Sequence, residues 1–252
     1  MSGSLARHTA GPLLRAPGRR LLQVRRQYDR RKAATVLGLA ALVVLGTAGI
    51  GGVSSPAGLR GDPVAARELV ALMRAGERGS WSVKYEFTRT LAGGRALRQS
   101  MQEARDPSMH VLRSGSAMTV DQGRRSYDCN LADGRPACTE SAAAKVLPPS
   151  EVVRVAVSMG AYAVAAAAGA TIAGERVRCF RVLATGRGQL PDLGVETDLC
   201  LAAGGVALRQ RIVRATGDVD ERLAQTVSDR VTTAAVRAVA RGFDPGAESG
   251  RG

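Results

Sequence analysis

Four cysteines are the residues of this sequence whose type and spacing point most directly to chemistry. Cys129, Cys138, Cys179 and Cys200 all lie in the second half of the chain. In a domain outside the cytoplasm, an even number of cysteines indicates disulfides, and four cysteines allow three pairings. Zinc is the alternative, but the cysteines have neither paired C-x-x-C spacing nor an adjacent histidine.

The segment between the first two cysteines narrows the choice of pairing. It contains Asp133-Gly134, a favoured two-residue hairpin turn. A hairpin centred there places Cys129 directly opposite Cys138 in a close pair, with Cα atoms about 4.5 Å apart. Pro136 then falls where the ladder does not need its missing N–H. We therefore predict disulfides 129–138 and 179–200.

Groups suited to catalysis are sparse. His110 is the one histidine beyond the N-terminal region, and the nearby Ser114-Gly115-Ser116 is typical of a turn rather than of a nucleophile. The acidic residues Asp218, Asp220 and Glu221 fit solvated charges in a loop. Nucleophile-elbow, zinc-protease, phosphate-loop and dinucleotide motifs do not occur in this part of the sequence. We predict a protein that is not an enzyme, with no catalytic residues, metal or cofactor.

One strand-like segment concentrates aromatic residues. Trp81, Val83, Tyr85 and Phe87 alternate with polar residues, so a strand here has one apolar face. This face is the candidate lining of a site for a lipid or another apolar ligand. The alternative, which the pattern favours more strongly, is that the same side chains pack as ordinary core.

An uncharged segment near the N-terminus predicts a membrane helix. Residues 33–50 contain no charge and, with residues 51–53, are long enough to cross a bilayer. Residues 1–32 hold nine basic groups against one acid, whereas the ten residues after the segment hold only Arg60. The positive-inside rule places the N-terminus in the cytoplasm and the rest outside. The length favours an anchor, although Ser55-Pro56-Ala57 leaves open a cleaved signal.

The net charge of +14 does not indicate nucleic-acid binding. Much of it lies in the basic tail before the membrane segment. Aromatic residues make up 3% of the chain, and no basic run beyond the tail interleaves with them. We predict no nucleic-acid partner.

The elements that would position these residues are mostly strands. Asp62-Pro63 begins a helix that ends near Gly76. Period-two segments then predict an antiparallel meander, with strands at 81–88, 96–104, 109–114, 117–121, 125–130, 136–140, 176–183, 195–201, 205–214 and 221–229. Gly93-Gly94 and Gly204-Gly205 are predicted turns. The tail after Phe243 is predicted to be disordered.

The segment between the two groups of strands is rich in alanine and valine. Pro148-Pro149-Ser150 predicts a helix start, and we expect a packed helix over Glu151–Ala168. The absence of charge after Arg154 leaves a second membrane span over 152–173 as an alternative. Polar residues dilute that segment, and alanine contributes little to insertion.

Four stretches resemble the LolA-like lipoprotein-carrier superfamily, including the actinobacterial LppX/LprG-type envelope proteins. They are Ile172–Val182, Glu196–Leu201, Gly205–Arg211 and Phe243–Pro245. The resemblance implies an incomplete barrel of curved antiparallel sheet covered by helices, with an apolar cavity that binds acyl chains. The chain departs from the lipoproteins in having no cysteine directly after its membrane segment, so attachment would be through a protein helix.

Together these features predict an α+β protein with five parts. They are a basic cytoplasmic tail (1–32), a transmembrane helix (33–53), a linker (54–61), an extracytoplasmic LolA-like domain (62–245) and a disordered tail (246–252). The expected function is a single-pass, membrane-anchored binding module for a lipid or other apolar ligand in the cell envelope. A structural or sensory protein that contacts an envelope partner is the alternative.

Overall fold

A computed structural model describes residues 61–123, 125–131, 137–141, 147–186, 190 and 192–243. These residues fall almost entirely within the predicted domain at 62–245. The predicted tail at 1–32, transmembrane helix at 33–53, nearly all of the linker and the tail at 246–252 lie outside the described residues.

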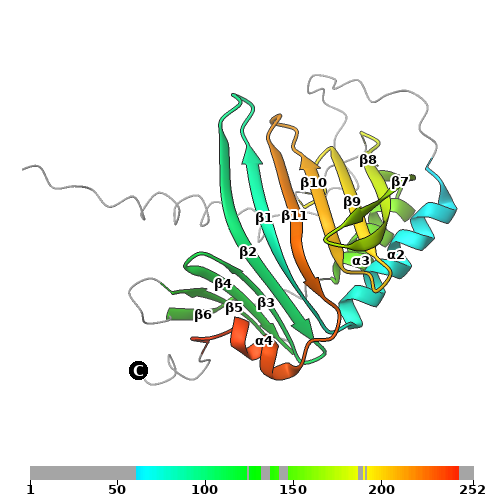
Figure 1. The fold of residues 1–252 in the computed structure, drawn as a ribbon. Helices are drawn as coiled ribbons and strands as arrows, with labels where there is room; N and C mark the ends of the chain where they lie inside the picture. The colour runs from blue at the N-terminus through cyan, green and yellow to red at the C-terminus, as the bar shows by residue number, and fades with distance from the viewer. Residues whose placement is uncertain are drawn as a thin grey trace, which may run out of the picture. The chain divides into compact units, whose positions relative to one another are not determined.

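The described residues form one large antiparallel sheet (Figure 1). Its eleven strands lie in the order β6-β5-β4-β3-β2-β1-β11-β10-β9-β8-β7, so the sheet consists of two meanders joined by the pair of β1 and β11. The strands are β1 (Trp81–Thr90), β2 (Ala96–Asp106), β3 (Met109–Ser114), β4 (Ala117–Gln122), β5 (Arg125–Asn130), β6 (Ala137–Ser141), β7 (Tyr162–Ile172), β8 (Glu175–Ala184), β9 (Glu196–Ala202), β10 (Ala207–Val213) and β11 (Val219–Ser228). The period-two pattern predicts all of them except β7.

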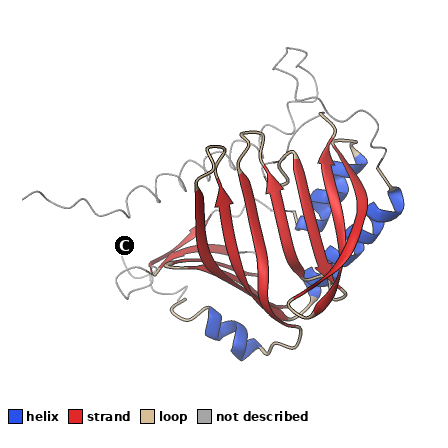
Figure 2. Cartoon of the chain, turned by 45° about the horizontal axis from the view of Figure 1, so that its top comes forward, coloured by secondary structure: helices blue, strands red, loops and turns tan. Residues whose placement is uncertain are grey.

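The sheet is curved and does not close on itself. β3–β6 turn away from the plane of the long strands β1, β2 and β11 (Figure 2). β6 and β7 are the two edges. The predicted curved antiparallel sheet is therefore present.

Helices cover only parts of this sheet. The helix α2 (Pro63–Arg78) packs against α3 (Pro149–Ser158) and β7, whereas α4 (Thr233–Val239) packs against β2 and β3. The Asp62 side chain accepts a 2.8 Å hydrogen bond from the Val64 N–H, which confirms the predicted helix start. The helix α4 was not predicted, although Thr232 supplies a capping hydroxyl for it.

The predicted helix over Glu151–Ala168 is wrong in its second half. The helix α3 ends at Ser158, Gly160 adopts a positive φ of 66°, and the chain then enters β7. Tyr162 and Val164 are buried on one face of β7, which pairs with β8 along most of its length. Pairing and burial thus override the helical propensity of the alanines. Within the described part of the chain, no helix is long and apolar enough to cross a membrane.

The buried residues form clusters on both faces of the sheet. One cluster lies between α2, α3 and the β7–β9 end, and includes Leu69, Val153 and Phe180. Another lies under α4 on β2–β5, and includes Val111, Val120 and Val236. By strand register, Val111 and Phe180 lie on opposite faces of the sheet. The face opposite α4 on β1–β5 is called here the inner face.

Candidate binding site

The four residues of the predicted apolar ligand face lie on one face of β1. Trp81, Val83 and Tyr85 are buried, at 8%, 1% and 2% exposure, whereas Phe87 is half-buried. The Trp81 indole N–H donates a 2.8 Å hydrogen bond to the Gly76 carbonyl, and the Tyr85 hydroxyl donates a 2.7 Å hydrogen bond to the Ala207 carbonyl. These two bonds hold both rings in the interior, so Phe87 is the residue of the four with accessible side-chain surface.

A chain of polar side chains crosses the inner face beside these rings. Its members are Arg222, Glu103, His110, Asp121 and Ser126, from β11, β2, β3, β4 and β5. The His110 Nε2 lies 2.9 Å from Glu103 Oε1, and its Nδ1 lies 3.1 Å from Asp121 Oδ2. The other oxygen of each carboxylate accepts a hydrogen bond, from Arg222 at 3.3 Å and from the Ser126 hydroxyl at 2.6 Å. Neighbouring strands are thereby linked through their side chains as well as their backbones.

The ionisation of this network follows from its contacts. Burial by itself lowers the pKa of His110, but its hydrogen bonds to Asp121 and Glu103 outweigh that effect and raise the pKa to about 9. Burial raises the pKa of the Glu103 carboxyl, but Arg222 and His110 outweigh it and lower that pKa overall. Burial also raises the pKa of Tyr85 far above its ordinary value. At neutral pH the network therefore contains an imidazolium between two carboxylates.

This arrangement leaves His110 without the features of a catalytic base. A base needs a neutral imidazole with a free nitrogen, whereas both nitrogens here face carboxylates. Ser114 and Ala117 flank the turn between β3 and β4, as predicted for Ser114-Gly115-Ser116. No group of three or more potential metal ligands is found among the described residues. The network links five strands on the inner face, β11 and β2–β5.

A second buried carboxylate corrects the prediction that Asp220 is a solvated loop charge. Asp220 is 5% exposed and lies at the start of β11. Its oxygens accept hydrogen bonds from Arg89 and from Arg214, the latter at 2.8 Å. These two arginines lower the pKa of the Asp220 carboxyl in spite of its burial. Sequence patterns do not reveal this site, because Arg89 lies 131 residues before Asp220 in the chain.

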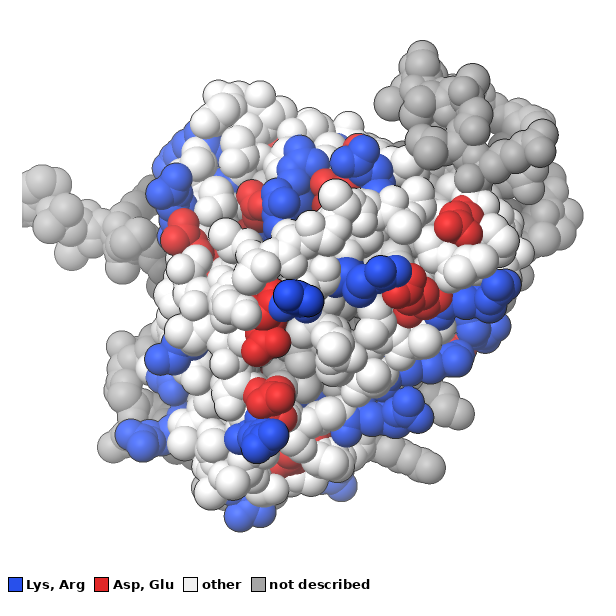
Figure 3. Space-filling model, turned by 45° about the vertical axis from the view of Figure 1, so that its right-hand side comes forward, with Lys and Arg blue, Asp and Glu red and all other residues white. Residues whose placement is uncertain are grey.

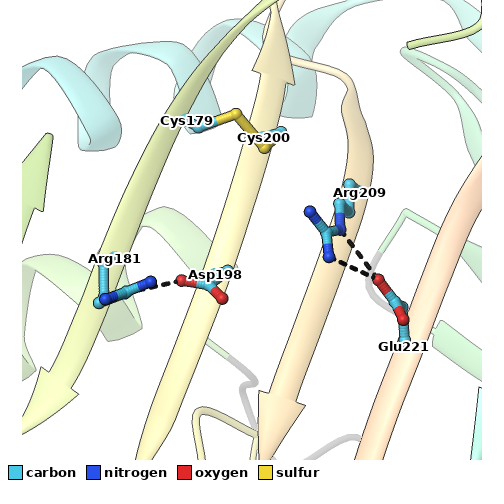
Figure 4. Close-up of a disulfide and its surroundings, with 6 residues drawn as sticks. All are labelled: Cys179, Arg181, Asp198, Cys200, Arg209 and Glu221. Atoms are coloured by element: carbon cyan, nitrogen blue, oxygen red, sulfur yellow. Dashed lines mark hydrogen bonds and ion pairs between the residues drawn. A yellow bond between two sulfur atoms is a disulfide. The ribbon is translucent and has the colours of Figure 1, made fainter. Parts of the chain in front are cut away.

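Both predicted disulfides are present. Cys129 bonds to Cys138 across β5 and β6, and Cys179 bonds to Cys200 across β8 and β9. In each pair the cysteines face each other directly, with Cα atoms 4.0 Å apart. Beside Cys179–Cys200 lie the ion pairs Arg181–Asp198 and Arg209–Glu221 (Figure 4). The predicted hairpin turn at Asp133-Gly134 lies outside the described residues.

One open depression of the described surface is lined by residues with polar side chains. This depression of about 390 Å³ lies beside β2, lined by Tyr85, Glu86, Arg98, Gln99, Ser100 and Gln225. Elsewhere basic side chains border acidic ones, as the face in Figure 3 shows. Among the described residues, Arg74 and Arg154 both contact Glu151, and Arg178 contacts Glu68.

Comparisons with known proteins give matches in structure alone. No protein-family model matches the chain. No curated protein matches its sequence. The Pseudomonas aeruginosa MucA/MucB complex structure aligns at 15% identity and a TM-score of 0.44, over 65% of this chain and 56% of that one. A MucB crystal structure aligns at 15% identity and a TM-score of 0.47, over 70% and 62%.

The LolA superfamily is also found among the matching structures. A LolA-superfamily protein from Nitrosomonas europaea aligns at 9% identity and a TM-score of 0.31, over 68% of this chain and 96% of that one. The resemblance to this superfamily, expected from the sequence, is therefore found again among solved structures. This chain spans about six tenths of the length of the MucB chains that it matches.

Proposed function

We propose that this protein is a membrane-anchored, extracytoplasmic binding module that acts by contacting an envelope protein. Residues 33–53 would form the anchor, and residues 62–245 would form the binding domain outside the membrane. The proposal rests on where the side chains of the predicted ligand face lie. The rings of Trp81 and Tyr85 are hydrogen-bonded into the interior, and the open depression beside β2 is lined by residues with polar side chains.

The two disulfides support the proposed location. All four cysteines are paired, and disulfides persist outside the reducing cytoplasm. Protein isolated from its native membrane in the presence of an alkylating agent should gain no alkyl mass unless it is first reduced and unfolded. Four alkylated thiols in unreduced protein would contradict an extracytoplasmic domain.

The protein-binding role is tested by photo-crosslinking in native membranes. A photoreactive amino acid is placed at Val64, Leu97 or Met159, which are 60%, 48% and 54% exposed and lie on α2, on β2 and beyond the end of α3. We expect a discrete protein adduct from at least one position. A control at the buried Leu69 should give none. Absence of a protein adduct from all three exposed positions would overturn the proposed role.

An apolar ligand is the second candidate, and half-buried side chains on the inner face favour it. Phe87, Met101 and Leu112 lie on neighbouring strands of that face and retain accessible surface. Native mass spectrometry of the detergent-purified chain should then show a bound lipid, and Phe87→Ala should weaken uptake of a fluorescent fatty acid. Purified protein with neither bound lipid nor fatty-acid uptake would exclude this candidate.

A further inference from the structure

The strand β2 extends beyond the strand that pairs with its outer side. It pairs with β1 from Ala96 to Arg105, but its pairing with β3 begins only at Met101, opposite Ser114. Among the described strands, the five residues Ala96–Ser100 therefore have a neighbour on one side only. All five are exposed, including Leu97 at 48%. This segment is called here the open edge.

The direction of the backbone groups on the open edge follows from one hydrogen bond. The Arg95 carbonyl accepts a 2.9 Å bond from the Leu91 N–H, so the polar groups of Arg95 point toward β1. Because these groups alternate along a strand, those of Leu97 and Gln99 also point toward β1. The N–H and C=O groups of Ala96, Arg98 and Ser100 therefore point away from the sheet, where an added strand would bind.

The open edge lacks two features that often protect a sheet edge from pairing, a β-bulge and a proline. The register of β1 with β2 runs through ten pairs without a bulge, and residues 96–100 contain no proline. By contrast, the edge strand β7 has a bulge between Ala167 and Ala170, and its Val164 carbonyl already accepts a bond from the Asp62 N–H. Of these two edges, the open edge of β2 has the regular backbone against which an added strand can pair.

The surroundings of the open edge indicate the chemistry of its partner. Arg98 and Ser100 line the open depression together with Glu86 of β1 and Gln225 of β11. Lys84 and Arg113 pair in register with Gln102, just beyond Ser100. The acid in this group is Glu86, half-exposed and 3.9 Å from Arg98. Three basic groups against one acid favour an acidic segment.

We propose that the open edge binds an extended, acidic segment of a partner protein, which adds a strand to the sheet beside β2. Backbone hydrogen bonds to Ala96, Arg98 and Ser100 supply affinity, and Arg98, Lys84 and Arg113 supply the preference for acidic side chains. This inference rests on the proposed function as a protein-binding module.

Two substitutions test the inference with the full-length chain in detergent. The probes are two fluorescein-labelled peptides of about seven residues. One alternates valine with glutamate, and the other alternates valine with lysine. Ser100→Pro removes an outward N–H without removing a bond to β1, so it should lower affinity for the acidic peptide at least tenfold, about 1.4 kcal/mol. Ser100→Ala keeps the N–H and should bind as the wild type does. Arg98→Glu should narrow or reverse the preference for the acidic peptide.

The peptide itself provides a test that does not depend on folding of the variants. N-methylation at alternate residues blocks backbone bonding along one side of the peptide, so one of the two alternating patterns should abolish binding and the other should preserve it. Equal binding of both patterns, absence of binding to the wild type, or wild-type affinity in folded Ser100→Pro would overturn the inference. A crosslink at Met159 without one at Leu97 would also contradict it, but would leave the proposed protein-binding role standing.

Discussion

Glu103 on β2 and His110 on β3 face each other through a 2.9 Å contact between Oε1 and Nε2. The contact lies on the inner face, where Glu103 is 8% exposed and also contacts Arg222. One carboxylate thereby joins β3 to β11 across β2 and β1. The stability of this half of the sheet should depend on it.

Stability should depend on pH through His110. Its pKa of about 9 in the folded protein lies above the ordinary value of 6.5, so between these values the folded state holds more protons than the unfolded state. The stabilisation is complete below pH 6.5 and is lost as the pH rises through 9. We expect the free energy of unfolding to fall by about 3 kcal/mol over this range. Denaturant titrations of wild type and His110→Gln measure this, and an equal slope in both would contradict the role of His110.

Glu103→Gln should destabilise the folded state by about 2 to 3 kcal/mol, because it leaves His110 and Arg222 without their shared negative partner. The matched control is Glu86→Gln on β1, whose carboxylate is half-exposed and 3.9 Å from Arg98. That change should alter the free energy of unfolding by less than about 0.5 kcal/mol. Chemical denaturation followed by tryptophan fluorescence compares the two, and similar losses would show that Glu103 has no special role.

Removal of the Cys179–Cys200 disulfide by a double substitution to alanine should cost about 3 kcal/mol. The bond closes a loop with a sequence separation of 21, and the chain entropy of that loop sets the magnitude. The corresponding change at Cys129 and Cys138, with a separation of 9, should cost slightly less. Calorimetry of both double variants checks the order. A Cys179/Cys200 variant as stable as the wild type would contradict it.

Gly205→Ala should destabilise the protein by about 3 kcal/mol or more. Gly205 has a φ of +80°, and a Cβ there would overlap the Leu72 carbonyl of α2. Gly94 has the same φ, but a Cβ at that position would meet nothing within 4 Å. Gly94→Ala therefore reports the backbone strain alone, about 1 kcal/mol. Thermal unfolding of the pair isolates the contact between this turn and α2, and equal shifts in both variants would show that it is unimportant.

Local pattern was sufficient for much of the fold. Alternation of apolar and polar residues placed every described strand except β7, and Asp62-Pro63 placed the start of α2. The hairpin geometry paired Cys129 with Cys138, and elimination then paired Cys179 with Cys200. Most of these features depend on residues that lie close together in the sequence. The second disulfide follows because only two cysteines remain once Cys129 and Cys138 are paired.

Tertiary structure decided what depends on distant partners. The alanine-rich segment of β7 favours a helix by its own propensity, and pairing with β8 made it a strand. Asp220 became a buried ion-pair site because the fold brought Arg89 to it, and His110 became an imidazolium because Glu103 and Asp121 flank it on adjacent strands. The open edge of β2 arises because β2 extends beyond β3, and the register between these two strands decides which residues of β2 extend. Local sequence thus determined most of the elements, whereas the order and offset of the strands determined which charges are buried and which backbone groups are exposed.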